Sequence, residues 1–248
     1  MLKYAWIRDD TMKKRAIITG CAKGIGREIA LELARDGYDI IGTFNTSIYE
    51  MYTLKEKVEA IGVNFYSYKV DLLDEDEING FCNGIKDKFD SIDVLVNNAA
   101  LSLDNSFKDK TTTEFRCVLQ VNLISPFLLI QRLSDIMDDG VIINISSTDG
   151  INTYTRLNMD YSASKAGLIN LTKSLSLELE NIRVYAICPN WVDTESIREM
   201  NKDYLKVEME RIGQKELIDP KEVAHKVIRL IESDLKSGSI VVMEDKYE

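Results

Sequence analysis

The sequence predicts an α/β protein with a three-layer α/β/α architecture and a doubly wound, seven-stranded parallel sheet. Short apolar runs alternate with amphipathic stretches along almost the whole chain, which is typical of a parallel sheet covered by helices on both faces. The runs are apolar at nearly every position, as in Val141-Ile-Ile-Asn-Ile145, which indicates strands buried on both faces. No Gly-, Ser- or Pro-rich linker interrupts the pattern, so we expect one continuous domain.

The individual elements follow from where the periodicity changes. Strands are expected over residues 16–19, 40–44, 64–70, 94–96, 141–145, 184–188 and 239–243. Helices are expected over residues 26–35, 49–60, 76–89, 113–137, 164–180 and 220–232. Residues 1–11 carry no period and are interpreted as an N-terminal extension of a domain that spans residues 12–248. Within that domain, the amphipathic residues 195–213 are expected to cover a substrate.

Composition and charge exclude several classes of function. The chain of 248 residues has 31 Lys and Arg against 41 Asp and Glu, and its net charge of −10 disfavours nucleic acid or an anionic membrane as the main partner. No uninterrupted apolar run reaches the roughly 18–20 residues of a spanning helix, and the start lacks a secretory pattern, so we expect a cytoplasmic protein. Cys21, Cys82, Cys117 and Cys188 form no C-x-x-C pair, and His225 is the single histidine. We therefore expect no metal site, and buried, reduced thiols.

A glycine-rich turn follows the first predicted strand and opens the first predicted helix. In Thr19-Gly20-Cys-Ala-Lys23-Gly24-Ile-Gly26, the first glycine permits a sharp turn, the second a close approach to a pyrophosphate, and the third close packing of helix on strand. The N–H groups at the start of that helix attract phosphates. This position in the chain predicts a dinucleotide site.

The end of the second predicted strand indicates which dinucleotide binds. NAD-binding proteins place a carboxylate there for the ribose 2′-hydroxyl, whereas this chain has Asn45, Thr46 and Ser47. Lys23, inside the glycine turn, offers a cation to a 2′-phosphate. We therefore expect NADP(H) to be preferred over NAD(H).

A tyrosine and a lysine four residues apart form the predicted reactive pair. Tyr161 and Lys165 fall on one face of a helix, and a nearby ammonium favours the phenolate and would lower the phenol pKa from about 10. Ser147 follows the fifth predicted strand, where ligands of open α/β sheets bind, and its loop can bring it beside Tyr161.

With these motifs in this order, residues 14–243 resemble the short-chain dehydrogenase/reductases. The resemblance implies a Rossmann fold and a catalytic tetrad of Ser147, Tyr161, Lys165 and Asn122. Asp71 matches the acid at the adenine ring, and Asn97-Asn98-Ala99 matches the motif that stabilises the central strand. The implied cofactor-binding residues are Gly20, Lys23, Gly24, Ile25, Gly26, Asn45, Thr46, Asp71, Leu72, Asn98, Ala99, Tyr161, Lys165, Pro189, Val192 and Thr194.

The resemblance also implies a mechanism and exposes two departures. Ser147 would bind a carbonyl oxygen, and Tyr161 would protonate it. Lys165 would lower the Tyr161 pKa and hold the nicotinamide ribose. Asn122 would support a water molecule that leads to solvent. Pro126 is expected to bend the long helix near Asn122. The family has glycine where this chain has Ala100 and Asn190; Asn190 is expected to keep the turn through left-handed backbone angles, and the bulky Trp191 could close over the substrate.

The sequence indicates a carbonyl compound as the substrate but leaves more than one class of carbonyl compound possible. The overall pattern is most similar to 3-oxoacyl-(acyl-carrier-protein) reductases, which implies an acyl-thioester substrate, but the acidic residues 134–140 disfavour docking of an acidic carrier protein. A sugar, polyol or small-alcohol dehydrogenase is the alternative, and a non-enzymatic cofactor-sensing protein is a third reading, which the intact tetrad opposes. The family's long helices imply a homodimer or homotetramer.

Overall fold

The computed structural model describes residues 13–244, and it confirms the predicted parallel sheet. Seven strands pair in the order β3-β2-β1-β4-β5-β6-β7, every neighbouring pair parallel. The strands are β1 (Arg15–Ile18), β2 (Asp39–Phe44), β3 (Phe65–Lys69), β4 (Val94–Asn97), β5 (Val141–Ile145), β6 (Arg183–Pro189) and β7 (Ile240–Met243). The predicted extension over residues 1–11 lies outside the described residues.

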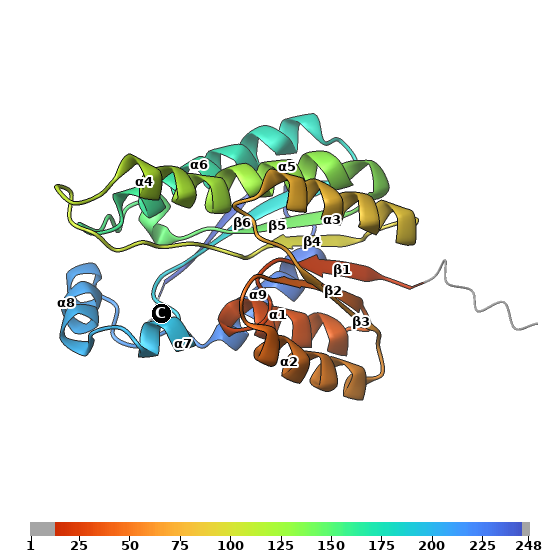
Figure 1. Cartoon of the computed structure of the whole chain (residues 1–248), viewed down its shortest axis with the longest axis horizontal. Coiled ribbons are helices and arrows are strands. Elements are labelled where there is room, and N and C mark those ends of the chain that lie inside the picture. The colour runs from red at the N-terminus through yellow and green to blue at the C-terminus, as the bar shows by residue number, and fades with distance from the viewer. Residues whose placement is uncertain (1–12, 245–248) are drawn as a thin grey trace, which may run out of the picture.

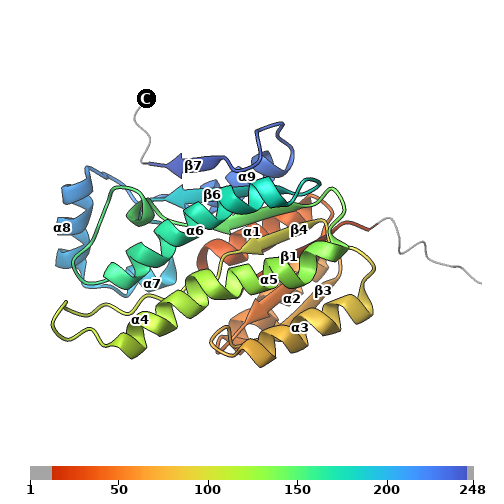
Figure 2. The same cartoon turned by 90° about the horizontal axis from the view of Figure 1, so that it is seen from above.

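Helices cover both faces of the sheet, as Figure 1 and Figure 2 show. On one face lie α1 (Gly24–Arg35), α2 (Ile48–Ile61) and α9 (Pro220–Ile231); on the other lie α3 (Glu75–Lys88), α4 (Thr112–Leu119), α5 (Ser125–Leu133) and α6 (Met159–Glu178). Each face has its own core of buried side chains, because successive strand residues point to opposite faces. Cys21, Cys82 and Cys188 are buried in these layers as expected, whereas Cys117 is only partly buried.

The strand order creates the crevice in which the site forms. The chain winds outward from β1 through β2 to β3, then returns to pair β4 with the other side of β1. The connections after β1 and β4 therefore diverge to opposite faces of the sheet. A crevice opens at this point, outside the carboxyl ends of the strands.

The long helix predicted over residues 113–137 is interrupted. A π-helical turn over Gln120–Ile124 separates α4 from α5, and Pro126 lies in the first turn of α5. Pro126 has no N–H to donate to the carbonyl of Asn122, so an unbroken α-helix cannot form there. The helix is thus interrupted near Asn122, whereas the expected bend stays a prediction.

The same stretch, Thr112–Ile136, is long and apolar enough to cross a membrane by length and composition alone. This differs from the expectation that no stretch would pass such a test. Nearly half of it is buried inside the protein, with Leu129, Ile130 and Leu133 in the core of one sheet face. Core helices meet the same criterion, so its apolar character is explained by packing on the sheet.

Candidate active site

A cavity of about 530 Å³ opens beyond the carboxyl ends of β5 and β6. Ser147, Tyr161 and Lys165 all line it, although they come from different elements: Ser147 follows β5, and the other two lie on α6. Their convergence agrees with the expectation from motif spacing. Asn98, from the end of β4, and Ile25, from the glycine turn, line the same cavity.

Lys165 is buried against the end of β5. Its side chain is only 2% exposed, and its ammonium donates a hydrogen bond of 2.8 Å to the carbonyl of Ile145. The Lys165 Nζ atom lies 5.3 Å from the centre of the Tyr161 ring. Tyr161 and Lys165 therefore line the same cavity, and the hydrogen bond to Ile145 holds the Lys165 amine at the end of β5.

The pKa values of this pair differ from the expectation. Burial raises the pKa of Tyr161, and the Asp149 charge raises it further, while a hydrogen bond from Ser147 opposes both. Burial also lowers the pKa of Lys165 to about 8. The expected fall in the Tyr161 pKa is therefore wrong for this structure, because desolvation of the phenolate outweighs the hydrogen bond from Ser147. The phenol therefore stays protonated at neutral pH and is a weaker acid than an ordinary tyrosine, whereas the amine releases its proton more readily than an ordinary lysine.

The side chain of Asn122 forms hydrogen bonds to both the loop after β4 and helix α6. Its Oδ1 accepts from the backbone N–H of Leu101 at 2.7 Å, and its Nδ2 donates to the Leu101 carbonyl at 2.9 Å and to the Ser164 hydroxyl at 3.0 Å. Asn122 has no exposed surface, and Ser164 stands immediately before Lys165. The asparagine thus ties the loop after β4 to the helix that carries the reactive pair.

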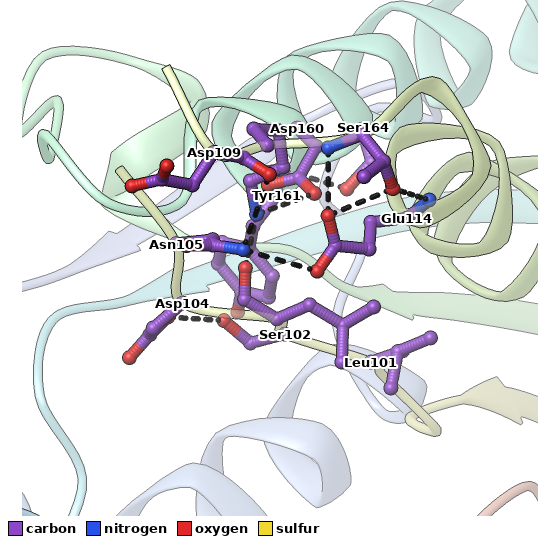
Figure 3. Close-up of polar contacts among 12 residues, drawn as sticks. Leu101, Ser102, Asp104, Asn105, Asp109, Glu114, Asp160, Tyr161 and Ser164 are labelled. Atoms are coloured by element: carbon purple, nitrogen blue, oxygen red, sulfur yellow. Dashed lines mark hydrogen bonds and ion pairs between the residues drawn. The ribbon is translucent and has the colours of Figure 1, made fainter. Parts of the chain in front are cut away.

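A buried ion pair joins the same loop to the start of α6. The Lys110 ammonium lies 3.0 Å from Asp160 Oδ2, with both side chains almost fully buried, and it also donates to the carbonyl of Leu103. Asp160 Oδ1 accepts from the backbone N–H of Tyr161 at 3.0 Å. Figure 3 shows Asp160 and Tyr161 beside the polar contacts of this loop, in which Asn105 Nδ2 donates to Glu114 Oε1 at 3.3 Å. The loop is therefore fastened to the residue next to the phenol.

We expect Lys110→Met to lower the free energy of unfolding by about 3–5 kcal/mol, because Asp160 is left buried without a counter-charge. Urea unfolding followed by circular dichroism measures this loss. Lys108→Met, at an exposed position of the same loop, is the matched control. The double variant K110M/D160N removes both charges and should recover most of the stability. A loss below about 1 kcal/mol for Lys110→Met would contradict the prediction, since that is the size of an exposed pair.

The glycine turn has the geometry that its spacing predicts. Gly24 has a left-handed φ of +52°, and a Cβ on Gly26 would lie 2.4 Å from the Asn98 side chain. Asn98 Nδ2 donates to the carbonyls of Thr19 and Gly20 at 2.9 and 3.1 Å, and the Thr19 hydroxyl accepts from the N–H groups of Asn98 and Ala99. The Asn98 side chain thus joins the ends of β1 and β4 and holds the turn open.

An anionic group already lies at the start of α1. Glu195 Oε2 accepts from the N–H of Gly24 at 3.0 Å, and Glu195 Oε1 lies 3.2 Å from Arg27 Nη1. Arg27 is held in turn by two hydrogen bonds to the carbonyl of Ala22. These donors hold a carboxylate, so they suit the diphosphate of a dinucleotide, which offers the same charge sign and acceptor oxygens.

We expect Glu195→Gln to bind NADPH about fivefold more tightly, because the competing contact loses its charge and roughly 1 kcal/mol of its strength. Fluorescence or calorimetric titration measures the dissociation constant directly. Glu178→Gln, an exposed acid at the far end of α6, is the control and should bind as the wild type does. Unchanged or weaker binding by Glu195→Gln would show that this carboxylate does not compete with the cofactor.

The residues predicted at the adenosine end lie away from the cavity, at the carboxyl ends of β2 and β3. Asn45 and Thr46 are exposed after β2, and Asp71 Oδ1 accepts from the N–H of Leu73 at 2.9 Å. Leu72 is buried, and its carbonyl accepts from the Ser125 hydroxyl. The role of these four residues at the adenosine end of a dinucleotide stays a prediction.

Lys23 has a partner that the sequence did not indicate. Its ammonium lies 2.8 Å from Glu50 Oε1, on α2. An incoming 2′-phosphate would compete with this carboxylate for the lysine.

The segment after β6 closes the opposite side of the cavity. Pro189, Val192 and Thr194 line it together with Trp191, and the segment predicted over residues 195–213 contributes Ser196, Ile197, Met200 and Ile212. That segment forms α7 (Glu195–Arg198) and α8 (Lys202–Ile212). Across residues 13–244, Asp139 alone among non-glycine residues has a positive φ. The left-handed conformation expected for Asn190 is therefore wrong; instead its Oδ1 accepts from the Thr148 hydroxyl at 2.5 Å.

Four charged residues of this site escaped the sequence analysis: Lys110, Asp149, Asp160 and Glu195. Three of them stand beside a motif, since Asp160 precedes Tyr161, Asp149 is two residues after Ser147, and Glu195 follows Thr194. That adjacency was an available signal. Their partners, however, lie far along the chain and were not visible from any local pattern.

The fold and the cavity together define an NAD(P)-dependent oxidoreductase. The chain belongs to the short-chain dehydrogenase family, whose model matches residues 14–205.

Individual relatives extend the similarity to nearly the whole chain. A 3-oxoacyl-[acyl-carrier-protein] reductase of Staphylococcus aureus is 35% identical over 204 residues, covering 80% of this chain and 82% of that protein. The crystal structure of a short chain dehydrogenase from Burkholderia cenocepacia in complex with NADP has a TM-score of 0.87 and 26% identity, covering 93% of this chain and 96% of that one. Acetoin dehydrogenase from Salmonella typhimurium has a TM-score of 0.79 and 27% identity, covering 94% of both chains.

Proposed function

We propose that this protein is an NADPH-dependent reductase that converts a ketone to a secondary alcohol, with Tyr161 as general acid. The observation that carries the proposal is the convergence of Ser147, Tyr161 and Lys165 on one cavity beside the glycine turn. The presence of these three residues together with Asn122 also favours an enzyme over a cofactor-sensing protein, because a protein that only senses the cofactor does not need a proton donor.

Each residue has a defined task in this reaction. NADPH, when bound, supplies the hydride for the carbonyl carbon. The Ser147 hydroxyl hydrogen-bonds the carbonyl oxygen and stabilises the negative charge that develops there. Tyr161 gives that oxygen its phenolic proton, which its raised pKa keeps in place at neutral pH. The Lys165 ammonium, with a pKa of about 8, then returns a proton to the phenolate. Asn122 keeps the start of α6 in position through Ser164.

The preference for NADP(H) is part of the proposal and rests on Lys23. We expect Lys23→Met to weaken NADPH binding about tenfold relative to NADH, and Glu50→Gln to strengthen NADPH binding by freeing the lysine. Fluorescence titration with both dinucleotides measures these ratios. Lys55→Met, on the exposed side of α2, is the control. Equal weakening of NADH and NADPH by Lys23→Met would show that the lysine does not face the 2′-phosphate.

Two substrate classes are supported by different observations. The 3-oxoacyl reductase among the relatives favours a 3-oxoacyl thioester, without docking of a carrier protein because the protein is acidic. A sugar, polyol or small-alcohol dehydrogenase is the second candidate, and it is favoured by Asp104, Asp149 and Asn158, which line the cavity and can accept hydrogen bonds from hydroxyl groups.

We also propose a cytoplasmic location and a homodimer or homotetramer. The four cysteines are free, as expected in a reducing compartment. Ile124 and Phe127, on the long helical stretch, are each 39% exposed, and Leu177 of α6 is 85% exposed. These apolar side chains suit a contact between copies of the chain, which sedimentation velocity would reveal.

The test of the reaction is loss of NADPH absorbance on a carbonyl panel that includes acetoacetyl thioesters, keto-sugars and small ketones. Turnover of any ketone with NADPH, and its loss in the Tyr161 variant, would support the proposal. NADPH binding without turnover of any member would favour the cofactor-sensing alternative.

A further inference from the structure

The cavity beside Tyr161 is lined by three side chains that can accept hydrogen bonds from a ligand. Asp104, Asp149 and Asn158 all contribute to its wall. Within the described residues 13–244, neither carboxylate forms an ion pair with a lysine, arginine or histidine. Simple acyl chains and unsubstituted ketones bring no donor to such a wall.

Of these three residues, Asp149 is the closest in sequence to a proposed catalytic residue, since it stands two positions after Ser147. It lies in the short helical turn Thr148–Gly150 after β5, and its N–H donates to the Ser147 Oγ atom at 3.1 Å. Its Oδ1 accepts from the Thr153 hydroxyl at 2.6 Å. Its charge acts directly on the Tyr161 phenol, so the carboxylate and the proton donor share one space.

The cation that acts on Asp149 is already engaged elsewhere. Arg211 Nε donates to Glu208 Oε2 at 2.8 Å, and Arg211 Nη2 donates to the carbonyl of Thr153 at 2.6 Å. Burial raises the pKa of Asp149, and the hydrogen bond from Thr153 and, after it, the Arg211 charge oppose that rise only in part. The carboxylate is thus partly desolvated without a counter-charge, a state that a donor from a ligand would relieve.

Asn158 provides a second and independent observation. It is only 7% exposed, lines the same cavity, and its Oδ1 atom has no hydrogen-bond partner within the described chain. A buried acceptor left unpaired costs about 1–3 kcal/mol, which a ligand donor can recover. Ile197, Met200 and Ile212 line another part of the cavity and suit a small apolar group.

We infer that Asp149 and Asn158 select ketones that carry a hydroxyl or ammonium group on the carbon next to the carbonyl. The inference rests on the proposed reaction and narrows its substrate class. Because Asp149 contacts Ser147 and lines the same cavity as Tyr161, a donor on the adjacent carbon would reach it while the carbonyl oxygen stays with the serine and the phenol.

Three ketones of nearly equal size test the inference: hydroxyacetone, aminoacetone and butan-2-one, which differ only in one hydroxyl, ammonium or methyl group. We expect the wild-type kcat/KM with NADPH to be at least about tenfold higher for hydroxyacetone or aminoacetone than for butan-2-one, as one good hydrogen bond would give. The two donor-bearing ketones distinguish a hydroxyl from an ammonium. Acetoacetyl-N-acetylcysteamine, a thioester without such a donor, is the fourth substrate.

Variants connect the preference to the residues. Asp149→Leu should bring the hydroxyacetone to butan-2-one ratio close to one, whereas Asp149→Asn, which keeps an acceptor, should retain part of the preference for the hydroxyl and lose any preference for the ammonium. Asp138→Asn, an exposed acid before β5 and so at the other end of the strand, is the matched control and should keep the wild-type ratio.

The wild-type ratio alone tests the inference even if Asp149→Leu fails to fold. Turnover of butan-2-one or of the thioester as good as that of both donor-bearing ketones would overturn the inference and leave the proposed reaction standing. A clear preference that survives Asp149→Leu in folded enzyme would also overturn the role of Asp149. If no ketone is turned over, the proposed function itself fails.

Discussion

Replacing Tyr161 with phenylalanine is expected to lower kcat for ketone reduction by about 10³–10⁴-fold, near the upper end of what a positioned general acid contributes. The substitution removes one oxygen from a side chain that lines the cavity and leaves the aromatic ring that packs near Lys165. The carbonyl oxygen then has no positioned proton donor, although Ser147 can still hydrogen-bond it. Steady-state kinetics with saturating NADPH measure the loss.

The loss in this variant should appear in turnover and not in cofactor binding. Removing one hydroxyl changes the NADPH dissociation constant by about fivefold at most, the value of one hydrogen bond of about 1 kcal/mol. Tyr154→Phe is the matched control, because this exposed tyrosine of the neighbouring loop donates only to the carbonyl of Ile151. A Tyr161→Phe enzyme that keeps more than about a tenth of the wild-type kcat would refute the general-acid role.

Lys165→Met is expected to lower kcat by about 10²–10³-fold and to change the pH profile. In the wild type, the Lys165 pKa of about 8 means that the ammonium is present below that pH and lost above it. Reduction consumes a proton, so kcat/KM for the ketone should be level at low pH and fall with rising pH through about 8. Without the amine, the remaining slow reaction should lose this inflection.

Profiles of log kcat/KM against pH for the wild type, Lys165→Met and Lys173→Met decide this point. Lys173 is an exposed lysine two turns further along α6, and its variant should keep the wild-type profile. If the decline near pH 8 persists in Lys165→Met, it belongs to another group. The raised pKa of Tyr161 predicts that the phenol itself does not titrate in this range.

The strands and helices of the fold could be predicted from the local pattern of apolar and polar residues in the sequence. The strand predicted over residues 141–145 is β5 as observed, and the strand predicted over residues 64–70 differs from β3 by one residue at each end. Apolar runs bounded by turns identify such strands because both their faces must be buried. Pro126 indicated a disturbance of the long helix near Asn122, but the sequence pattern did not show that it takes the form of a π-helical turn.

Two parts of the site were determined by the sequence itself. The four-residue spacing puts Tyr161 and Lys165 on one side of α6, and the glycines after β1 form the turn at the start of α1. Both features depend on backbone geometry within a few residues, so a short window contains all the information they need.

Only the tertiary structure decided the electrostatics of the site. Arg27 and Glu195 are 168 residues apart in sequence, and Lys110 meets Asp160 between two different elements. The pKa of Tyr161 likewise rises where its spacing from Lys165 predicts a fall. These outcomes depend on which charges meet across the fold and how far water is excluded from them. The distance between two charges and their desolvation set how strongly they interact and how far their pKa values shift, and both are fixed only when the chain has folded.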